Sequence, residues 1–114
     1  MRAAVIGSGA WGTALALVLL GNGHEAALWS YTQEESGAIA ARRENPMLPG
    51  VPLPDELELT ADLSCVKGRD LVVLATPSFA VRSTAKAIRA VIDPGVPVVL
   101  VSKGIEKGTS MLLH

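Results

Sequence analysis

Short apolar runs alternate along this sequence with longer stretches of helical character. The apolar runs predict strands at residues 2–6, 25–29, 71–75 and 97–101. The stretches that separate them predict helices over residues 10–22, 32–43 and 78–92. This alternation favours an α/β fold, in which helices pack on a parallel sheet and form three layers with it.

Local signals mark several element boundaries. Thr32 and Glu35 form a capping box, which predicts that a helix begins at that threonine. The Gly21, Asn22 and Gly23 segment supplies the backbone freedom that ends the helix before it. The remaining expectations are an irregular proline-rich loop at 45–54, an edge strand at 57–60, a short helix at 62–66 and a first helical turn at 109–114.

The apolar pattern also predicts burial. Apolar residues extend around most of the helix at 10–22, so it is expected to be buried on most sides. The runs at 71–75 and 97–101 are expected to be buried strands. Trp29 is expected to lie in the core, and His24 is expected to be a partly exposed structural residue.

Composition narrows the class of protein. A chain of 114 residues with 49% hydrophobic and 18% charged residues is typical of one well-buried domain, and it excludes a disordered chain. The net charge of −1 gives no reason to expect binding to nucleic acid or to an anionic membrane. No apolar run approaches the roughly 18 residues of a membrane span, and glycines interrupt the first run, so a cytoplasmic location is expected.

The lone cysteine, Cys65, has no partner for an internal disulfide, and no histidine or cysteine cluster indicates a metal site. Cys65 is therefore interpreted as a small, partly buried residue in a reduced compartment. A catalytic thiol is the less favoured alternative.

Gly7, Gly9 and Gly12 form a G-x-G-x-x-G motif directly after the first predicted strand, at the start of a predicted helix. In this context each glycine has a mechanical role in binding a dinucleotide. Gly7 permits a tight turn, Gly9 lets the backbone approach a pyrophosphate, and Gly12 lets the helix pack closely on the strand. The free N–H groups of the helix start would then hold the phosphates. The alternative is a glycine-rich turn without a ligand.

The end of the second strand normally carries the carboxylate that binds the adenosine ribose. Here no carboxylate occurs before Glu34, so the choice between NAD and NADP stays open. Tyr31 is expected to pack on the adenine. Arg42 and Arg43 would reach a 2′-phosphate only if the chain folds back, and a solvated helix end is the favoured interpretation for both.

The segments GSGAWGTALA at 7–16 and SKGIE at 102–106 together resemble the NAD(P)-dependent glycerol-3-phosphate dehydrogenases of bacterial type. Further matches span the whole chain in the family's order: NGHE at 22–25, LW at 28–29, LPG at 48–50, LP at 53–54 and TPS at 76–78. The chain departs from the family in the loop. That loop usually has an aromatic residue before LPG and one more residue after its asparagine, which is Asn45 here.

The resemblance implies a Rossmann-type, doubly wound domain and an enzyme that interconverts dihydroxyacetone phosphate and glycerol 3-phosphate by hydride transfer, a source of phospholipid backbones. By position, Ala10, Trp11 and Tyr31 would contact NAD or NADP. Lys103 would lie near both the nicotinamide and the phosphorylated substrate. Ser78 is expected to cap the following helix, with a place under the nicotinamide ribose as the alternative.

In the family, a helical C-terminal domain supplies the lysine that acts as general acid and base, so no catalytic residue is expected within residues 1–114. These residues are interpreted as the N-terminal cofactor-binding domain, inactive by itself and with enough exposed apolar surface to favour self-association or a homodimer. Two alternatives stay open: a non-catalytic NAD(P)-binding module, and the cofactor domain of a related hydroxyacid dehydrogenase.

Overall fold

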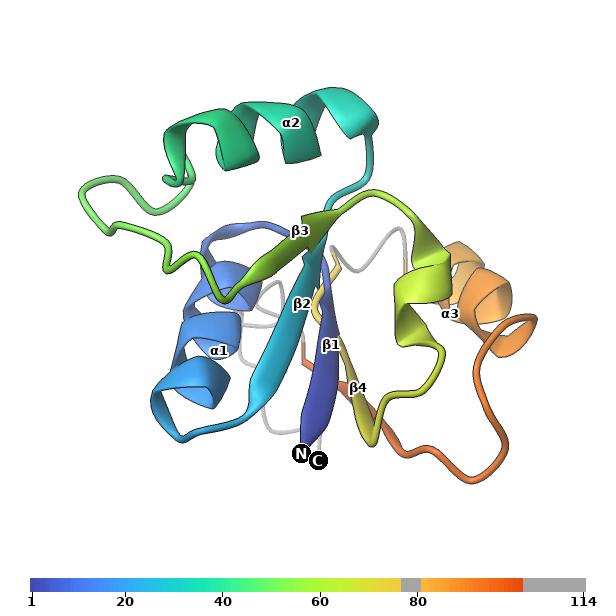
Figure 1. The fold of residues 1–114 in the computed structure, drawn as a ribbon. Helices are drawn as coiled ribbons and strands as arrows, with labels where there is room; N and C mark the ends of the chain where they lie inside the picture. Colours follow the sequence, from blue (N-terminus) through green and yellow to red (C-terminus); the bar gives the residue numbers. More distant parts are fainter. Residues whose placement is uncertain (77–80, 102–114) are drawn as a thin grey trace, which may run out of the picture.

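A five-stranded parallel sheet forms the middle of the molecule in the computed structural model, which describes residues 1–76 and 81–101 (Figure 1). Its spatial order is β3-β2-β1-β4-β5, and every neighbouring pair is parallel. The strands are β1 (Arg2–Ile6), β2 (Glu25–Trp29), β3 (Glu58–Thr60), β4 (Leu71–Leu74) and β5 (Val98–Leu100). This topology confirms the predicted α/β fold with a doubly wound sheet.

Helices cover both faces of the sheet and complete three layers (Figure 1). On one face lie α1 (Ala10–Gly21) and α2 (Gln33–Arg42), whose buried Ala16 and Ile39 share a core cluster. On the other lie the 3₁₀ helix η1 (Leu63–Val66) and α3 (Val81–Arg89), which contribute Val66 and Ile88 to a second cluster. The strands supply alternate side chains to the two clusters, because neighbouring residues of a strand point to opposite faces.

The local boundary signals are confirmed. The Thr32 hydroxyl accepts a hydrogen bond of 3.1 Å from the Glu35 amide and caps α2. Asn22 ends α1, and Gly23 follows with a φ of 86°. Asp62 caps η1 through the Ser64 amide, at 2.9 Å. The predicted helix start at 78–80 and the segment 102–114, with Lys103, lie outside the described residues.

Two burial predictions are wrong. All three residues of β5 are exposed, Val99 to 45%, because β5 forms the edge of the described sheet and pairs there with β4 alone. Helix α1 is fully buried only at Gly12, Thr13 and Ala16, and Val18 is 58% exposed. An apolar helix surface is buried only where another element packs on it, and the sheet covers one side of α1.

The strand order places a topological switch point at the carboxyl edge of the sheet, where a crevice is expected. The chain leaves β1 towards α1 on one face, and it leaves β4 towards α3 on the other. Because β1 and β4 are neighbours, the connections diverge between them, and ligands of doubly wound sheets bind at such points.

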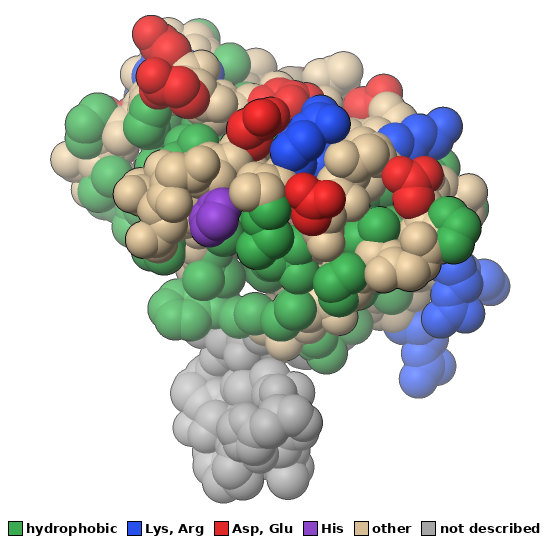
Figure 2. Space-filling model, turned by 60° about the horizontal axis from the view of Figure 1, so that its bottom comes forward, with side chains coloured by type: hydrophobic (Ala, Val, Ile, Leu, Met, Phe, Trp, Pro, Cys, Tyr) green, Lys and Arg blue, Asp and Glu red, His purple; other side chains and the backbone are tan. Residues whose placement is uncertain are grey.

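On the face drawn in Figure 2, charges of one sign do not gather into a separate region. Acidic and basic side chains lie among each other there, and hydrophobic side chains gather along its lower part. Among the described residues, no helix combines the length and apolar character that crossing a membrane requires.

Candidate functional site

The segment between β1 and α1 makes a tight turn at the crevice. Gly7 has a φ of 127°, a conformation that side chains rarely adopt, and its amide donates a hydrogen bond of 3.0 Å to the Trp29 carbonyl. A β-carbon at this position would lie 2.5 Å from the Ala75 carbonyl oxygen. Gly7 therefore lets the chain turn while it stays pressed between β2 and β4.

Gly12 and Gly9 have opposite surroundings. A β-carbon on Gly12 would collide with the Gly7 carbonyl oxygen, so the first turn of α1 packs directly on the turn before it. Gly9, by contrast, has no atom within 4 Å of the place where its β-carbon would be. One glycine thus permits close internal packing, while the other leaves open space over the backbone.

The N-terminus of α1 has features that suit an anion. Gly9 is its N-cap and has no side chain to accept from the first amides, and the first turn contains no acidic residue. The N-terminus of α2 is different, because Thr32 caps it and Glu34 and Glu35 lie in its first turn. The first four N–H groups of a helix lack partners within the helix, and the positive end of the helix dipole lies there. Of these two helices, α1 is the one that leaves these groups for a ligand.

Two aromatic side chains flank this turn and are exposed. Trp11, in the first turn of α1, is 48% exposed, and Tyr31, just after β2, is 51% exposed. The Tyr31 ring packs against Trp29, with centroids 5.3 Å apart and planes tilted by 50°. Trp29 itself is 5% exposed, which confirms the prediction that it belongs to the core. Ala10, the first residue of α1, is partly buried.

Two buried hydroxyls at the carboxyl edge have no hydrogen-bond partner within the described structure. They belong to Ser30, directly after β2, and to Thr76, which follows β4. The residues are 1% and 2% exposed. Buried hydroxyls are nearly always paired, so these two, which have no partner among the described residues, are available for contact with a ligand. In the sequence, Thr76 stands out only as part of the TPS match at 76–78, and neither hydroxyl has a predicted role.

A buried polar cluster supports the turn from behind. The Asn45 side chain is 1% exposed and donates to the Ser8 carbonyl and to the Thr13 hydroxyl, each at 2.7 Å. Its Oδ1 accepts from the Met47 amide at 3.0 Å. The sequence predicts neither Asn45 nor Thr13 as a site residue, because the first lies in a proline-rich loop and the second lies within an apolar helix.

The expectation that Arg43 is a solvated helix end is also wrong. Its guanidinium donates to the Pro54 carbonyl and, at 3.1 Å, to the Leu57 carbonyl. Arg43 has a φ of 50°, which turns the chain back after α2 and brings the side chain over the loop. The residue therefore closes the 45–54 loop, whereas Arg42 is exposed as expected.

Cys65 lies away from the crevice, in η1. It is partly buried as predicted, and its carbonyl accepts from the Arg69 guanidinium at 2.7 Å. Loss of hydration on burial raises the pKa of the Cys65 thiol to about 11, and the positive charge of Arg69 offsets only part of that effect. A thiol protonated at neutral pH is a poor nucleophile, so the catalytic alternative is disfavoured.

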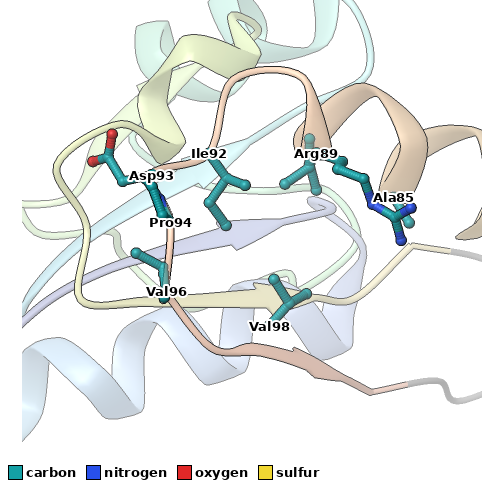
Figure 3. A pocket seen from close by; sticks show the side chains of 9 residues that line it. Ala85, Arg89, Ile92, Asp93, Pro94, Val96 and Val98 are labelled. Atoms are coloured by element: carbon teal, nitrogen blue, oxygen red, sulfur yellow. The ribbon is translucent and has the colours of Figure 1, made fainter.

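A hollow of about 500 Å³ also lies away from the crevice. Figure 3 shows it between α3 and the segment that enters β5, with Ala85 and Arg89 on one side and Val96 and Val98 on the other. This is the amino end of β5, and its walls are mostly apolar. Among the described residues, no cluster of three or more histidine, cysteine, aspartate or glutamate side chains has an arrangement suited to a metal ion.

Comparison with known proteins gives the same family for sequence and structure. The family model described as the N-terminus of NAD-dependent glycerol-3-phosphate dehydrogenase matches residues 2–114. The glycerol-3-phosphate dehydrogenase [NAD(P)+] of Agathobacter rectalis is 42% identical over 114 residues, which cover 98% of this chain and 34% of that protein. This chain thus spans about a third of the length of the curated relatives that it matches.

Solved structures agree. The crystal structure of glycerol-3-phosphate dehydrogenase from Coxiella burnetii has a TM-score of 0.84 and 33% identity, covering 94% of this chain and 34% of that one. A ketopantoate reductase from Ralstonia eutropha has a TM-score of 0.75 and 26% identity, covering 99% of this chain and 38% of its own. The same architecture therefore also occurs in a dehydrogenase class of different substrate.

Gly12→Ala is expected to destabilise the chain by about 3 kcal/mol, since the new methyl group would push the first turn of α1 off the Gly7 carbonyl. Gly37→Ala is the matched control, because Gly37 lies within α2 with open space around its β-carbon position. That change should stabilise by about 0.5–1 kcal/mol. Urea denaturation measures both, and equal effects would contradict the packing role of Gly12.

Cys65 is expected to react slowly with iodoacetamide at pH 8, because its raised pKa keeps it protonated in the folded chain. The rate should rise with pH up to a pKa of about 11. The same reaction in denaturant is the control, and there the rate should level off near the usual thiol pKa of about 8.5. Mass spectrometry follows this single cysteine cleanly, and identical profiles in both states would refute the assignment.

Proposed function

This chain belongs to the N-terminal domain family of the NAD-dependent glycerol-3-phosphate dehydrogenases, and from that premise we propose that it binds NAD or NADP at the carboxyl edge of its sheet. The observation that carries the proposal is the N-terminus of α1, which has a glycine N-cap, no acidic residue in its first turn and open space over Gly9. A pyrophosphate fits that arrangement, because it accepts several backbone hydrogen bonds at once.

Different residues around the turn contact different parts of the cofactor. Gly7 and Gly12 shape the turn, and Gly9, Ala10 and Trp11 offer backbone amides to the pyrophosphate. Tyr31, exposed beside the end of β2, packs on the adenine or its ribose. The orphan hydroxyl of Ser30 lies at the end of the same strand and is suited to a buried contact there.

The other half of the crevice suits the nicotinamide. Thr76, with its unpartnered hydroxyl, follows β4, and the nicotinamide half of a dinucleotide lies on that side of the switch point. Lys103 follows β5 in the sequence, and its role near the nicotinamide and the substrate rests on the family resemblance of the SKGIE segment. The reduced nicotinamide would supply the hydride, and these residues would bind and orient its ring.

The complete reaction we propose is the family's, the interconversion of dihydroxyacetone phosphate and glycerol 3-phosphate. The relatives named for this activity are about three times longer than the part that this chain matches. Hydride transfer needs the substrate held against the nicotinamide in a site closed to water. We therefore assign cofactor binding to residues 1–114, and we assign the general acid and base to the C-terminal domain that the family carries.

A non-catalytic cofactor-binding module is the second candidate function, and the cofactor domain of a related hydroxyacid dehydrogenase is the third. The ketopantoate reductase fold favours the third only at the level of architecture. The SKGIE and LPG segments support the glycerol-3-phosphate family instead.

NADH and NADPH are expected to quench the fluorescence of Trp11 in a saturable way, with dissociation constants in the micromolar to sub-millimolar range. Gly9→Ala should weaken NADH binding by about tenfold, because its methyl group occupies the approach of the pyrophosphate without touching the protein. Gly37→Ala again serves as the matched control and should bind normally. The ratio of the two affinities gives the cofactor preference, and no quenching by either dinucleotide would overturn the proposal.

The 114-residue chain is expected to oxidise no detectable NADH with dihydroxyacetone phosphate, even when saturated with cofactor. The physical reason is the absence of a closed cleft around the substrate. A coupled absorbance assay measures the turnover, with a full-length family member as the positive control. Turnover near that of the positive control would refute the assignment of the general acid and base to the C-terminal domain.

A further inference from the structure

One peptide in the turn that faces the cofactor could take either of two orientations, because the glycine in it allows both. This is the Ser8–Gly9 peptide, in which the Ser8 carbonyl and the Gly9 N–H point in opposite directions, because a trans peptide is planar. Glycine accepts either orientation at low cost. In one orientation the Gly9 N–H faces the open space over the turn. In the other, the Ser8 carbonyl oxygen faces it and would repel a phosphate.

We propose that Asn45 is a positioning residue that selects the orientation able to bind an anion, by holding the Ser8 carbonyl on the buried side of the turn. The inference rests on the proposed cofactor site and extends it to a residue 37 positions away in sequence. The Asn45 Nδ2 donates to that carbonyl at 2.7 Å, and the Gly9 N–H is therefore directed away from the buried cluster. Asn45 touches no part of the open space itself.

The chemistry of the cluster defines the orientation of the carboxamide. The Ser8 carbonyl can only accept, and the Met47 amide can only donate, so Nδ2 must face the first and Oδ1 the second. The second Nδ2 hydrogen goes to the Thr13 hydroxyl, which in turn lies 3.4 Å from the Ser8 carbonyl. Both N–H groups of the Asn45 side chain and one of the two lone pairs of its oxygen are thus used. A buried network in which both donors are paired holds the side chain in one geometry.

The loop has anchors besides Asn45. The Arg43 guanidinium donates to the Pro54 and Leu57 carbonyls, and the Leu53 amide donates to the Arg43 carbonyl at 2.7 Å. The Gly50 amide donates to the Glu44 carboxylate at 2.9 Å. The two N–H groups of Asn45 are therefore directed at the turn, and their removal is expected to alter the turn more than the loop.

Two variants of the 114-residue chain test the proposal. Asn45→Ala removes every contact of the carboxamide. Asn45→Asp keeps its shape and the acceptor for the Met47 amide, but at neutral pH it has no hydrogen to offer the Ser8 carbonyl. Thr13→Val is a third variant for the case that the others fold poorly. It removes the hydroxyl that accepts from Asn45 Nδ2 at 2.7 Å and lies 3.4 Å from the Ser8 carbonyl, and it keeps the direct hydrogen bond from Asn45 to that carbonyl. The controls are Met47→Ala, exposed in the same loop, and Ile39→Val, a mild core change in α2.

Two measurements separate positioning from stability. In the absence of ligand, the Gly9 amide resonance in a ¹H–¹⁵N spectrum is expected to shift or split in the Asn45 variants and to stay in place in both controls. Affinity for NADH is expected to fall by about tenfold in the same variants. Affinity for adenosine, which has no phosphate, is expected to stay unchanged. Ile39→Val should lower the unfolding midpoint without changing either readout.

Each outcome decides one point. Unchanged NADH affinity and an unchanged Gly9 resonance in Asn45→Ala and Asn45→Asp would overturn the role of Asn45, and the proposed cofactor site would stand. Equal losses for NADH and adenosine would assign Asn45 to general stability and would also overturn it. If the wild-type chain binds no NADH, the proposed function fails, and a shifted Gly9 resonance would then mark Asn45 as a backbone support without a ligand.

Discussion

The contact between Gly12 and the Gly7 carbonyl governs the arrangement of this molecule. No side chain fits between them, so the first turn of α1 packs on the turn that follows β1. Gly7 is in turn pressed against the Ala75 carbonyl and bonded to the Trp29 carbonyl, which ties the turn to β4 and β2 on either side. One point thus holds together the three strands whose carboxyl ends define the crevice.

The electrostatic character of the crevice depends on the absence of a capping side chain and of acidic residues at the start of α1. Helix α1 has neither a capping side chain nor an acidic residue at its start, whereas α2 has both. A helix end that is not capped costs stability unless something else pairs with its amides. The orphan hydroxyls of Ser30 and Thr76 add to the same local deficit. Their location at one sheet edge suits a binding site, because a ligand there would supply the hydrogen-bond partners that these groups lack.

The proline-rich loop connects to the turn through polar contacts. Arg43 closes it, and Asn45 reaches the turn from it. Leu53 of the loop and Leu57 just after it belong to the same core cluster as Ile39 of α2, so the position of the loop is held from two sides. A segment that a sequence pattern describes only as irregular therefore has a defined place behind the cofactor turn.

The sequence by itself determined the layers, the approximate positions of the strands and helices, and the glycine turn, because these depend on periodicity, capping and backbone conformation within a few residues. Only the tertiary structure decided which apolar surfaces are covered: β5 is exposed at the edge, and α1 is buried on one side. It also decided the roles of Arg43 and Asn45, whose partners lie 11 to 37 residues away. Contacts over such separations depend on how the chain returns on itself, which no local pattern encodes.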